Sequence, residues 1–247
     1  MVIFKFIINF FQRLIRHLYW IYQLQNASRG VNFTFGFPVI VEGKGSLSFG
    51  NHCHLKKNVG LKKAKDSKII IGNNGFLDNE SHILTSEKCC LLVGDNFKLG
   101  ERSKLYVQNN WEFGNDVKIE TYCSIFSREQ GFYGCLKIKD GTHIGDNTIM
   151  DVTDNINIGY EVAIGPNCVL YTHDHDYSQK EKASWKGGTY TKPITIGDGA
   201  WIGSGVTILP GINIGSRCVV AAGSVITKNL EANSVYGGVP AKFIKSI

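Results

Sequence analysis

The stretch ITIGDGAWIGSGVTILPGINIGSRCVVAAGSVITK, residues 194–228, repeats with a period of six. An aliphatic residue recurs at each sixth position: Ile196, Ile202, Ile208, Ile214, Val220 and Ile226. An α-helix repeats about every 3.6 residues and a half-buried strand about every two, so this period fits neither. A six-residue unit does fit one side of a coil whose wall consists of three short strands. The aliphatic residue then lies inside the coil and a small residue occupies its corner. Hexapeptide repeats of this kind predict a parallel β-helix.

The repeat extends towards the N-terminus in a looser form, with aliphatic–glycine or aromatic–glycine pairs at Phe49-Gly50, Ile71-Gly72, Val93-Gly94 and Phe113-Gly114. A solenoid grows along one axis, so we expect a single elongated domain with appendages. The predicted parts are a helical segment over residues 1–30, coils over 40–230 and a tail over 231–247.

Two insertions interrupt the repeat, at residues 127–137 and 173–192. A solenoid tolerates insertions at its corners, and long loops in compact domains are usually functional or disordered. The second insertion contains Tyr177, Trp185 and Tyr190, whereas disordered segments are poor in aromatic residues. We therefore expect a protruding active-site loop at 173–192.

The composition is that of a globular protein with only a mild basic excess. The 247 residues are 43% hydrophobic, with a mean hydropathy of −0.08, a formal net charge of +6 and a pI near 8.9. This charge predicts no nucleic-acid partner. The densest basic run is Lys62, Lys63, Lys65 and Lys68, which is either a solvated loop or an attractor of an anionic ligand or surface.

The seven cysteines are odd in number, which argues against a disulfide framework. Cys53, Cys123, Cys168 and Cys218 each stand four residues after the hydrophobic residue that begins a repeat. There a thiol behaves as a small buried apolar group. We therefore expect a reduced, cytoplasmic protein.

Residues 1–24 predict an amphipathic helix. Helical spacing gathers its apolar residues on one broad face and Lys5, Gln12, Arg13 and Arg16 on the other. The stretch is too interrupted by charge to span a bilayer, and no signal-peptide cleavage site follows. Two interpretations remain open: the helix caps the end of the solenoid, or it lies weakly and reversibly at the inner face of the cell membrane.

Residues 138–245 resemble the hexapeptide-repeat acyltransferases, in particular the galactoside, maltose and Nod-factor acetyltransferases and their capsule and O-antigen relatives. The resemblance rests on ITIGDGAWIGSGVTILPGINIG (194–215), VVAAGSVITK (219–228) and YGGVPAKFI (236–244). It implies an all-β, left-handed parallel β-helix. It also implies a homotrimer with active sites between subunits, acetyl-CoA as the donor and a carbohydrate hydroxyl as the acceptor.

A base is needed to remove the proton of the attacking hydroxyl, and imidazole titrates near neutrality. In the run NCVLYTHDH the resemblance assigns the catalytic histidine to His175, with His173 as the competitor two residues upstream. It places Asp151 near an asparagine that assists the transition state in the galactoside group. An ordinary corner aspartate is the alternative for Asp151.

The resemblance also implies the acetyl-CoA contacts. Ser204 and Ala222 match positions at the thioester and pantetheine arm, and Thr227 and Lys228 match contacts farther along. Lys242 and Lys245 stand in place of phosphate-binding arginines, with a solvated tail as the alternative. Trp201 either lines the thioester groove or is a stacked residue of the solenoid.

Three other functions remain open. One is N-acetylation of an amino-sugar nucleotide on the same scaffold. The second is a γ-type carbonic anhydrase, which gathers three histidines around a metal, but His173 and His175 lack the spacing of that pair, so we expect no metal. The third is a purely structural β-helix. Our leading prediction is an O-acetyltransferase for a sugar of a surface polysaccharide or its precursor.

Overall fold

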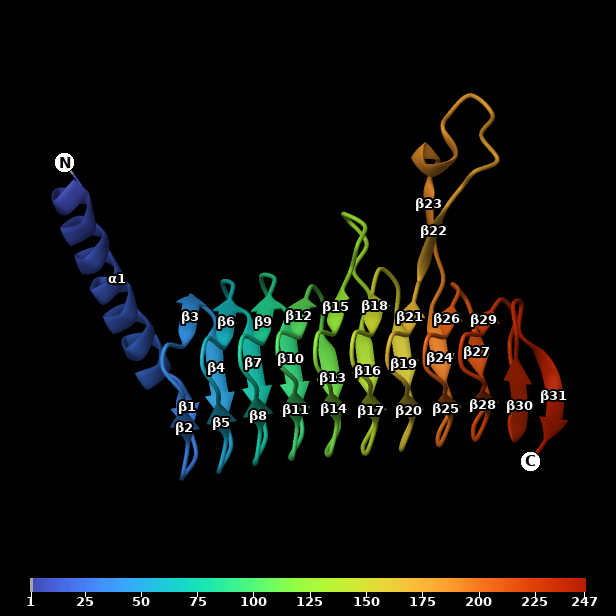
Figure 1. Cartoon of the computed structure of the whole chain (residues 1–247), viewed down its shortest axis with the longest axis horizontal. Helices are drawn as coiled ribbons and strands as arrows, with labels where there is room; N and C mark the ends of the chain where they lie inside the picture. The colour runs from blue at the N-terminus through green and yellow to red at the C-terminus, as the bar shows by residue number, and fades with distance from the viewer. Residues whose placement is uncertain (1) are drawn as a thin grey trace.

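The computed structural model describes residues 2–247, with side chains from residue 4 onward, and shows one helix followed by a long β-solenoid (Figure 1). Helix α1 spans Val2–Gln25. Three sheets then run along the solenoid, one per side of the coil, with nine, eleven and nine strands. All their strand pairs are parallel except the last pair of the eleven-stranded sheet, which is antiparallel. The fold is a left-handed parallel β-helix, so the predicted fold class is confirmed.

The first sheet consists of β1 (Ser28–Arg29), β4 (Ser46–Phe49), β7 (Lys68–Ile71), β10 (Cys90–Val93), β13 (Trp111–Phe113), β16 (Leu136–Ile138), β19 (Ile156–Ile158), β24 (Ile194–Ile196) and β27 (Asn213–Ile214). The second consists of β2 (Thr34–Phe35), β5 (His54–Leu55), β8 (Phe76–Leu77), β11 (Lys98–Leu99), β14 (Lys118–Ile119), β17 (His143–Ile144), β20 (Ala163–Ile164), β25 (Trp201–Ile202), β28 (Val219–Val220), β30 (Ser234–Gly237) and β31 (Lys242–Ser246). The third consists of β3 (Ile40–Gly43), β6 (Gly60–Lys63), β9 (His82–Thr85), β12 (Lys104–Val107), β15 (Ser124–Phe126), β18 (Ile149–Asp151), β21 (Val169–Leu170), β26 (Thr207–Ile208) and β29 (Val225–Ile226).

The core is a ladder of aliphatic side chains inside the coils. The register places Ile158 beside Ile196 and Ile196 beside Ile214, so equivalent positions of successive coils stack on one another. Each of these residues is buried. Burial of such a side chain contributes about 1.5–3 kcal/mol relative to exposure, which explains why the six-residue period is kept so strictly here.

The coil corners use residues that tolerate a left-handed backbone. Asn147 and Asn167 have φ of 56° and 60°, and Gly205 has φ of 68°. Asparagine enters this region more easily than most residues with a Cβ, and glycine enters it freely. The corner cysteines are buried as predicted, and none of the seven, all within the described residues, forms a disulfide.

The coils extend beyond the limits expected from sequence. The first coil begins at β1, before residue 40, and the segment 231–247 contains β30 and β31, which continue the second sheet. The insertion at 173–192 forms a hairpin of β22 (His173–His175) and β23 (Thr189–Thr191), with the short 3-10 helix η1 (Ser184–Lys186) near its tip. Figure 1 shows this hairpin standing well clear of the coils.

Helix α1 leaves the first coil at an angle and does not lie over the end of the solenoid along its length (Figure 1). Every described side chain from Phe4 to Arg16 is exposed, and Leu24, near the end of the helix, is buried. No helix within residues 2–247 has the length and apolar character needed to cross a membrane.

Candidate active site

The candidate site lies where three neighbouring strands of the third sheet end. The insertion at 127–137 follows β15, Asp151 ends β18, and the hairpin at 173–192 follows β21. Asp151 occupies the register position that Phe126 holds one coil earlier. The regular stacking of the coils therefore brings two insertions and one carboxylate to a single corner.

Asp151 is fully buried and its carboxylate is well satisfied by hydrogen bonds. The Thr153 hydroxyl donates to Oδ1 at 2.6 Å, and the backbone N–H of Arg128 donates to the same oxygen at 3.0 Å. The backbone N–H of Thr172 donates to Oδ2 at 3.3 Å. His173 Nδ1 lies 2.5 Å from Oδ2. A buried carboxylate needs such donors, because an unpaired one is costly to desolvate.

The contact with Asp151 fixes the orientation of His173. A carboxylate oxygen can only accept, so Nδ1 carries the proton and Nε2 is left as the basic atom of the neutral ring. The ring is also held edge-on between Tyr171 and His175, with centroid distances of 6.5 Å and 5.6 Å. This side chain is only 12% exposed. The arrangement suits a general base whose geometry is set before the reaction.

His175 has a different environment. Its side chain is 32% exposed, and its Nδ1 is buried with no hydrogen-bond partner among the described residues. Its Nε2 faces Glu129, 4.0 Å from Oε1. The same oxygen lies 3.5 Å from His173 Nε2. Glu129 belongs to the insertion at 127–137, so the two insertions meet over Asp151.

A cavity of about 250 Å³ opens beside the two histidines, lined by Tyr171, His173, Asp174, His175, Leu209 and Pro210. The ligand atoms of Glu129, His173 and His175 all lie within 4.8 Å of one another. Two imidazoles and a carboxylate at this spacing could hold a transition-metal ion.

Tyr190 stabilises the base of the hairpin. It pairs with Asp174 across the two strands, and its hydroxyl donates to Asp174 Oδ2 at 3.3 Å. Desolvation, followed by the charge of Asp174, raises the pKa of Tyr190, so the phenol stays protonated and remains a donor. The hairpin that carries both histidines is therefore held in register near the cavity.

The structure brings Asp151 and His173 together, whereas the resemblance assigns the base to His175. The two histidines are separated by one residue of an extended strand, so their side chains emerge on the same side of it, with ring centroids 5.6 Å apart. Only His173 reaches the buried carboxylate. The role of His175 as the base stays a prediction from the resemblance.

The predicted donor residues fall at two corners. Ser204 and Ala222 stack at the corner between the second and third sheets, where the Gly223 N–H donates to the Ser204 carbonyl at 2.8 Å. Thr227 and Lys228 follow β29 at the opposite end of the third sheet, the end that carries the histidine cavity.

The remaining predicted donor residues lie on the second sheet. Trp201 is 60% exposed. The register runs from Trp201 through Val219 and Val235 to Lys245, so the tryptophan and the lysine share one column of that sheet. Lys242 is exposed on the same last strand, β31. One chain therefore does not gather all the predicted donor residues at one place.

Sequence reasoning missed Glu129, Thr153 and Thr172. The available signal for Glu129 was that both insertions leave the coil at the same corner, with one coil between them. Thr153 and Thr172 gave no signal, because a threonine at a coil corner is common whether or not it binds a carboxylate.

A family model for the bacterial transferase hexapeptide, described as six repeats, matches residues 193–228. These residues are hexapeptide repeats of the bacterial transferase type. The predicted resemblance to the hexapeptide-repeat acyltransferases is therefore confirmed.

Known proteins match part of the chain. Galactoside O-acetyltransferase of Escherichia coli is 40% identical over 42% of this chain and 54% of its own length. A putative acetyltransferase of Saccharomyces cerevisiae is 44% identical over 35% of this chain and 43% of its own length. The chain thus spans about half the length of the curated relatives it matches. A hexapeptide-repeat acetyltransferase from Vibrio cholerae, solved with acetyl coenzyme A, is 35% identical, covering 54% of this chain and 69% of its own, with a TM-score of 0.47.

Proposed function

We propose that this protein transfers an acetyl group from acetyl-CoA to a hydroxyl of a carbohydrate. The observation that carries the proposal is the buried Asp151–His173 pair beside the cavity of a hexapeptide-repeat coil. Acetyl-CoA supplies the activated acetyl group, and the galactoside-acetylating relative supports a sugar as the acceptor.

His173 is the proposed base. Its Nε2 takes the proton of the acceptor hydroxyl as the hydroxyl oxygen attacks the thioester carbonyl carbon. When the tetrahedral intermediate collapses, the C–S bond breaks and the proton passes from Nε2 to the leaving sulfur. Asp151 holds the Nδ1 proton and stabilises the imidazolium between these two steps, as the aspartate of a catalytic triad does. His175, which has no such partner, is the alternative base implied by the resemblance.

A homotrimer supports the donor site best. Ser204 and Ala222 lie at one corner of the coil, and Thr227 lies at the corner that carries the histidines. A groove between two copies combines one corner from each, so both sets of residues face the same ligand. Trp201, Lys228, Lys242 and Lys245 are proposed to line the same donor site. Their exposure supports this role, because none of them is buried.

The acceptor is proposed to be a surface-polysaccharide sugar or its membrane-borne precursor, acetylated by a protein attached to the cell membrane at its inner face. Support comes from α1, whose apolar face is uncovered. N-acetylation of an amino-sugar nucleotide is the competing reaction, since the same base could serve an amine.

Two measurements test the proposal. Calorimetry should detect acetyl-CoA binding without any acceptor. Release of free thiol should then rise when maltose, a galactoside or a polysaccharide repeat unit is added, and treatment with EDTA should not lower it. If only an amino-sugar nucleotide increases thiol release, the reaction is N-acetylation and not O-acetylation. A protein that does not bind acetyl-CoA would overturn the proposal.

A further inference from the structure

The apolar face of α1 is exposed from Phe4 to Tyr22. It consists of eight side chains at helical spacing, all of them exposed: Phe4, Ile7, Ile8, Phe11, Leu14, Ile15, Leu18 and Tyr22. Phe4, Phe11 and Leu18 are 68%, 55% and 59% exposed. An apolar surface of this extent marks an interaction site, because single exposed apolar residues are ordinary but contiguous ones are not.

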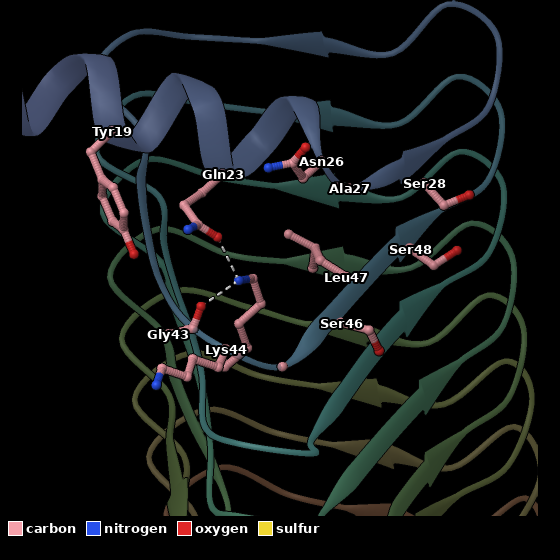
Figure 2. A pocket seen from close by; sticks show the side chains of 12 residues that line it. Tyr19, Gln23, Asn26, Ala27, Ser28, Gly43, Lys44, Ser46, Leu47 and Ser48 are labelled. Carbon is pink, nitrogen blue, oxygen red and sulfur yellow. Dashed lines mark hydrogen bonds between the residues drawn. The ribbon is translucent and has the colours of Figure 1, made fainter.

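The helix is attached to the first coil towards its C-terminal end. Leu24 is 2% exposed, and the His17 ring contacts Phe37 at the first coil, with a centroid distance of 4.9 Å. The buried Lys63 ammonium donates to Gln23 Oε1 at 2.9 Å and to the Gly43 carbonyl at 2.8 Å. Figure 2 shows Gln23 of α1 and Gly43 of β3 converging on the nitrogen that the dashed lines join.

These contacts between the end of α1 and the first coil determine which face of the helix stays exposed to solvent. The contacts to the coil use Trp20, Leu24 and neighbouring residues on one side of the helix, while the eight apolar residues point elsewhere. Burial lowers the pKa of Lys63, yet two protein acceptors hold its ammonium in place. The helix is therefore fixed to the coil at one end with its apolar face turned outward.

Charge identifies the partner. The first acidic residue of the chain is Glu42, whereas Lys5, Arg13, Arg16 and Arg29 precede it. Arg13 and Arg16 lie on the polar side of α1, in a groove against the first coil. A helix with an aromatic-rich apolar face and a purely cationic polar face fits the surface of an anionic bilayer.

We propose that α1 docks this protein on anionic phospholipid membranes by lying in the interface with its apolar face immersed. Lys5, Arg13 and Arg16 then face the phosphates. This inference deepens the membrane attachment proposed above, but it is measured without acetyl transfer, so either one can fail alone.

The test is co-sedimentation of the full chain with vesicles of phosphatidylcholine, with and without phosphatidylglycerol. We expect binding to the anionic vesicles that weakens at high salt. Phe11→Ser with Leu18→Ser removes two immersed side chains without changing the charge, and should weaken binding at least tenfold. Asn9→Ser with Gln12→Ser, on the polar face, is the matched control and should change it less than about twofold, since neither side chain is immersed.

Three results would overturn the inference. The first is no vesicle binding by the unmodified protein. The second is equal binding by the Phe11→Ser, Leu18→Ser variant and the control. The third is that the unmodified protein does not bind vesicles and the Phe11→Ser, Leu18→Ser variant changes the oligomeric state, as measured by light scattering. In that case a second copy of the chain covers the helix. Thiol release with a soluble acceptor should be the same for both variants.

Discussion

The coil interior and the corner that carries the insertions each contain fully buried residues but differ in chemistry. Met150 and Asp151 are adjacent on β18, and neither is exposed to solvent. Met150 stacks against Leu170 within the apolar ladder, whereas Asp151 is surrounded by donors from both insertions and from Thr153, two residues after its strand. Polar burial is expensive and is kept where the group has a task. The difference separates residues that hold the coil together from residues that carry its chemistry.

The largest effect is expected from Asp151→Asn. An amide cannot hold the Nδ1 proton of His173 as a carboxylate does, so the acetyl-transfer rate should fall by roughly 10²–10⁴-fold. Thermal unfolding should show that the variant still folds. Asp66→Asn, the same chemical change in an exposed turn of an early coil, is the control and should stay within about threefold of the unmodified rate, because it lies outside the candidate site. Equal rates for the two variants would remove Asp151 from the mechanism.

In the interior, Cys218→Leu should lower the free energy of unfolding by about 1–3 kcal/mol, because the corner is filled and a larger side chain must strain it. Cys218→Ala should cost less. Denaturant unfolding measures both changes, with Cys135→Leu at a partly exposed position as the control. Rapid alkylation of Cys218 in the native protein would contradict its burial.

The burial of the corner thiols should also make the protein less stable at alkaline pH. Burial raises the pKa of Cys123 and Cys218 from 9.0 to about 11, so the folded protein keeps protons that the unfolded chain has already lost. This contribution is complete below pH 9 and is lost as the pH rises towards 11. Unfolding free energies measured across this window should decline less in the double variant Cys123→Ala, Cys218→Ala. An identical slope in the variant would show that the thiols do not cause the decline.

The smallest effect is expected at the edge of the site. Glu129 lies 3.5 Å and 4.0 Å from the two histidine nitrogens, beyond a good hydrogen bond. Glu129→Gln should therefore lower the rate by less than about tenfold, with Glu181→Gln, elsewhere in the hairpin insertion, as the control. A loss as large as that of Asp151→Asn would give Glu129 a direct part in proton transfer.

The solenoid was predictable because its repeat is a local pattern. Each Ile or Val at a sixth position is buried in the coil, so its place in the sequence alone indicates its place in the fold. Spacing and composition also predicted an amphipathic helix over residues 1–24, where the structure has α1 at Val2–Gln25, and an insertion at 173–192, where it has a hairpin. The exposure of the apolar face of α1 could not be predicted, because the same amphipathic sequence suits a helix that caps the solenoid and a helix that lies on a membrane. Only the contacts of Leu24 and Lys63 show which side is covered.

The candidate site was half predictable. The family resemblance indicated Asp151 and a histidine of the HDH run, and the sequence itself showed that these histidines open a long insertion. It could not indicate that Asp151 meets His173, since that depends on the path of β22 out of the corner. Glu129 belongs to a different insertion, and a contact between two loops produces no repeating pattern in the sequence from which it could be predicted.

The central claim is that His173, held by Asp151, is the base. The most direct measurement compares acetyl-transfer rates of His173→Ala and His175→Ala under saturating acetyl-CoA, with the fold of both checked by thermal unfolding. We predict a loss of roughly 10²–10⁴-fold for His173→Ala and less than about tenfold for His175→Ala. A crippled His175→Ala beside an active His173→Ala would contradict the account and restore the assignment implied by the resemblance.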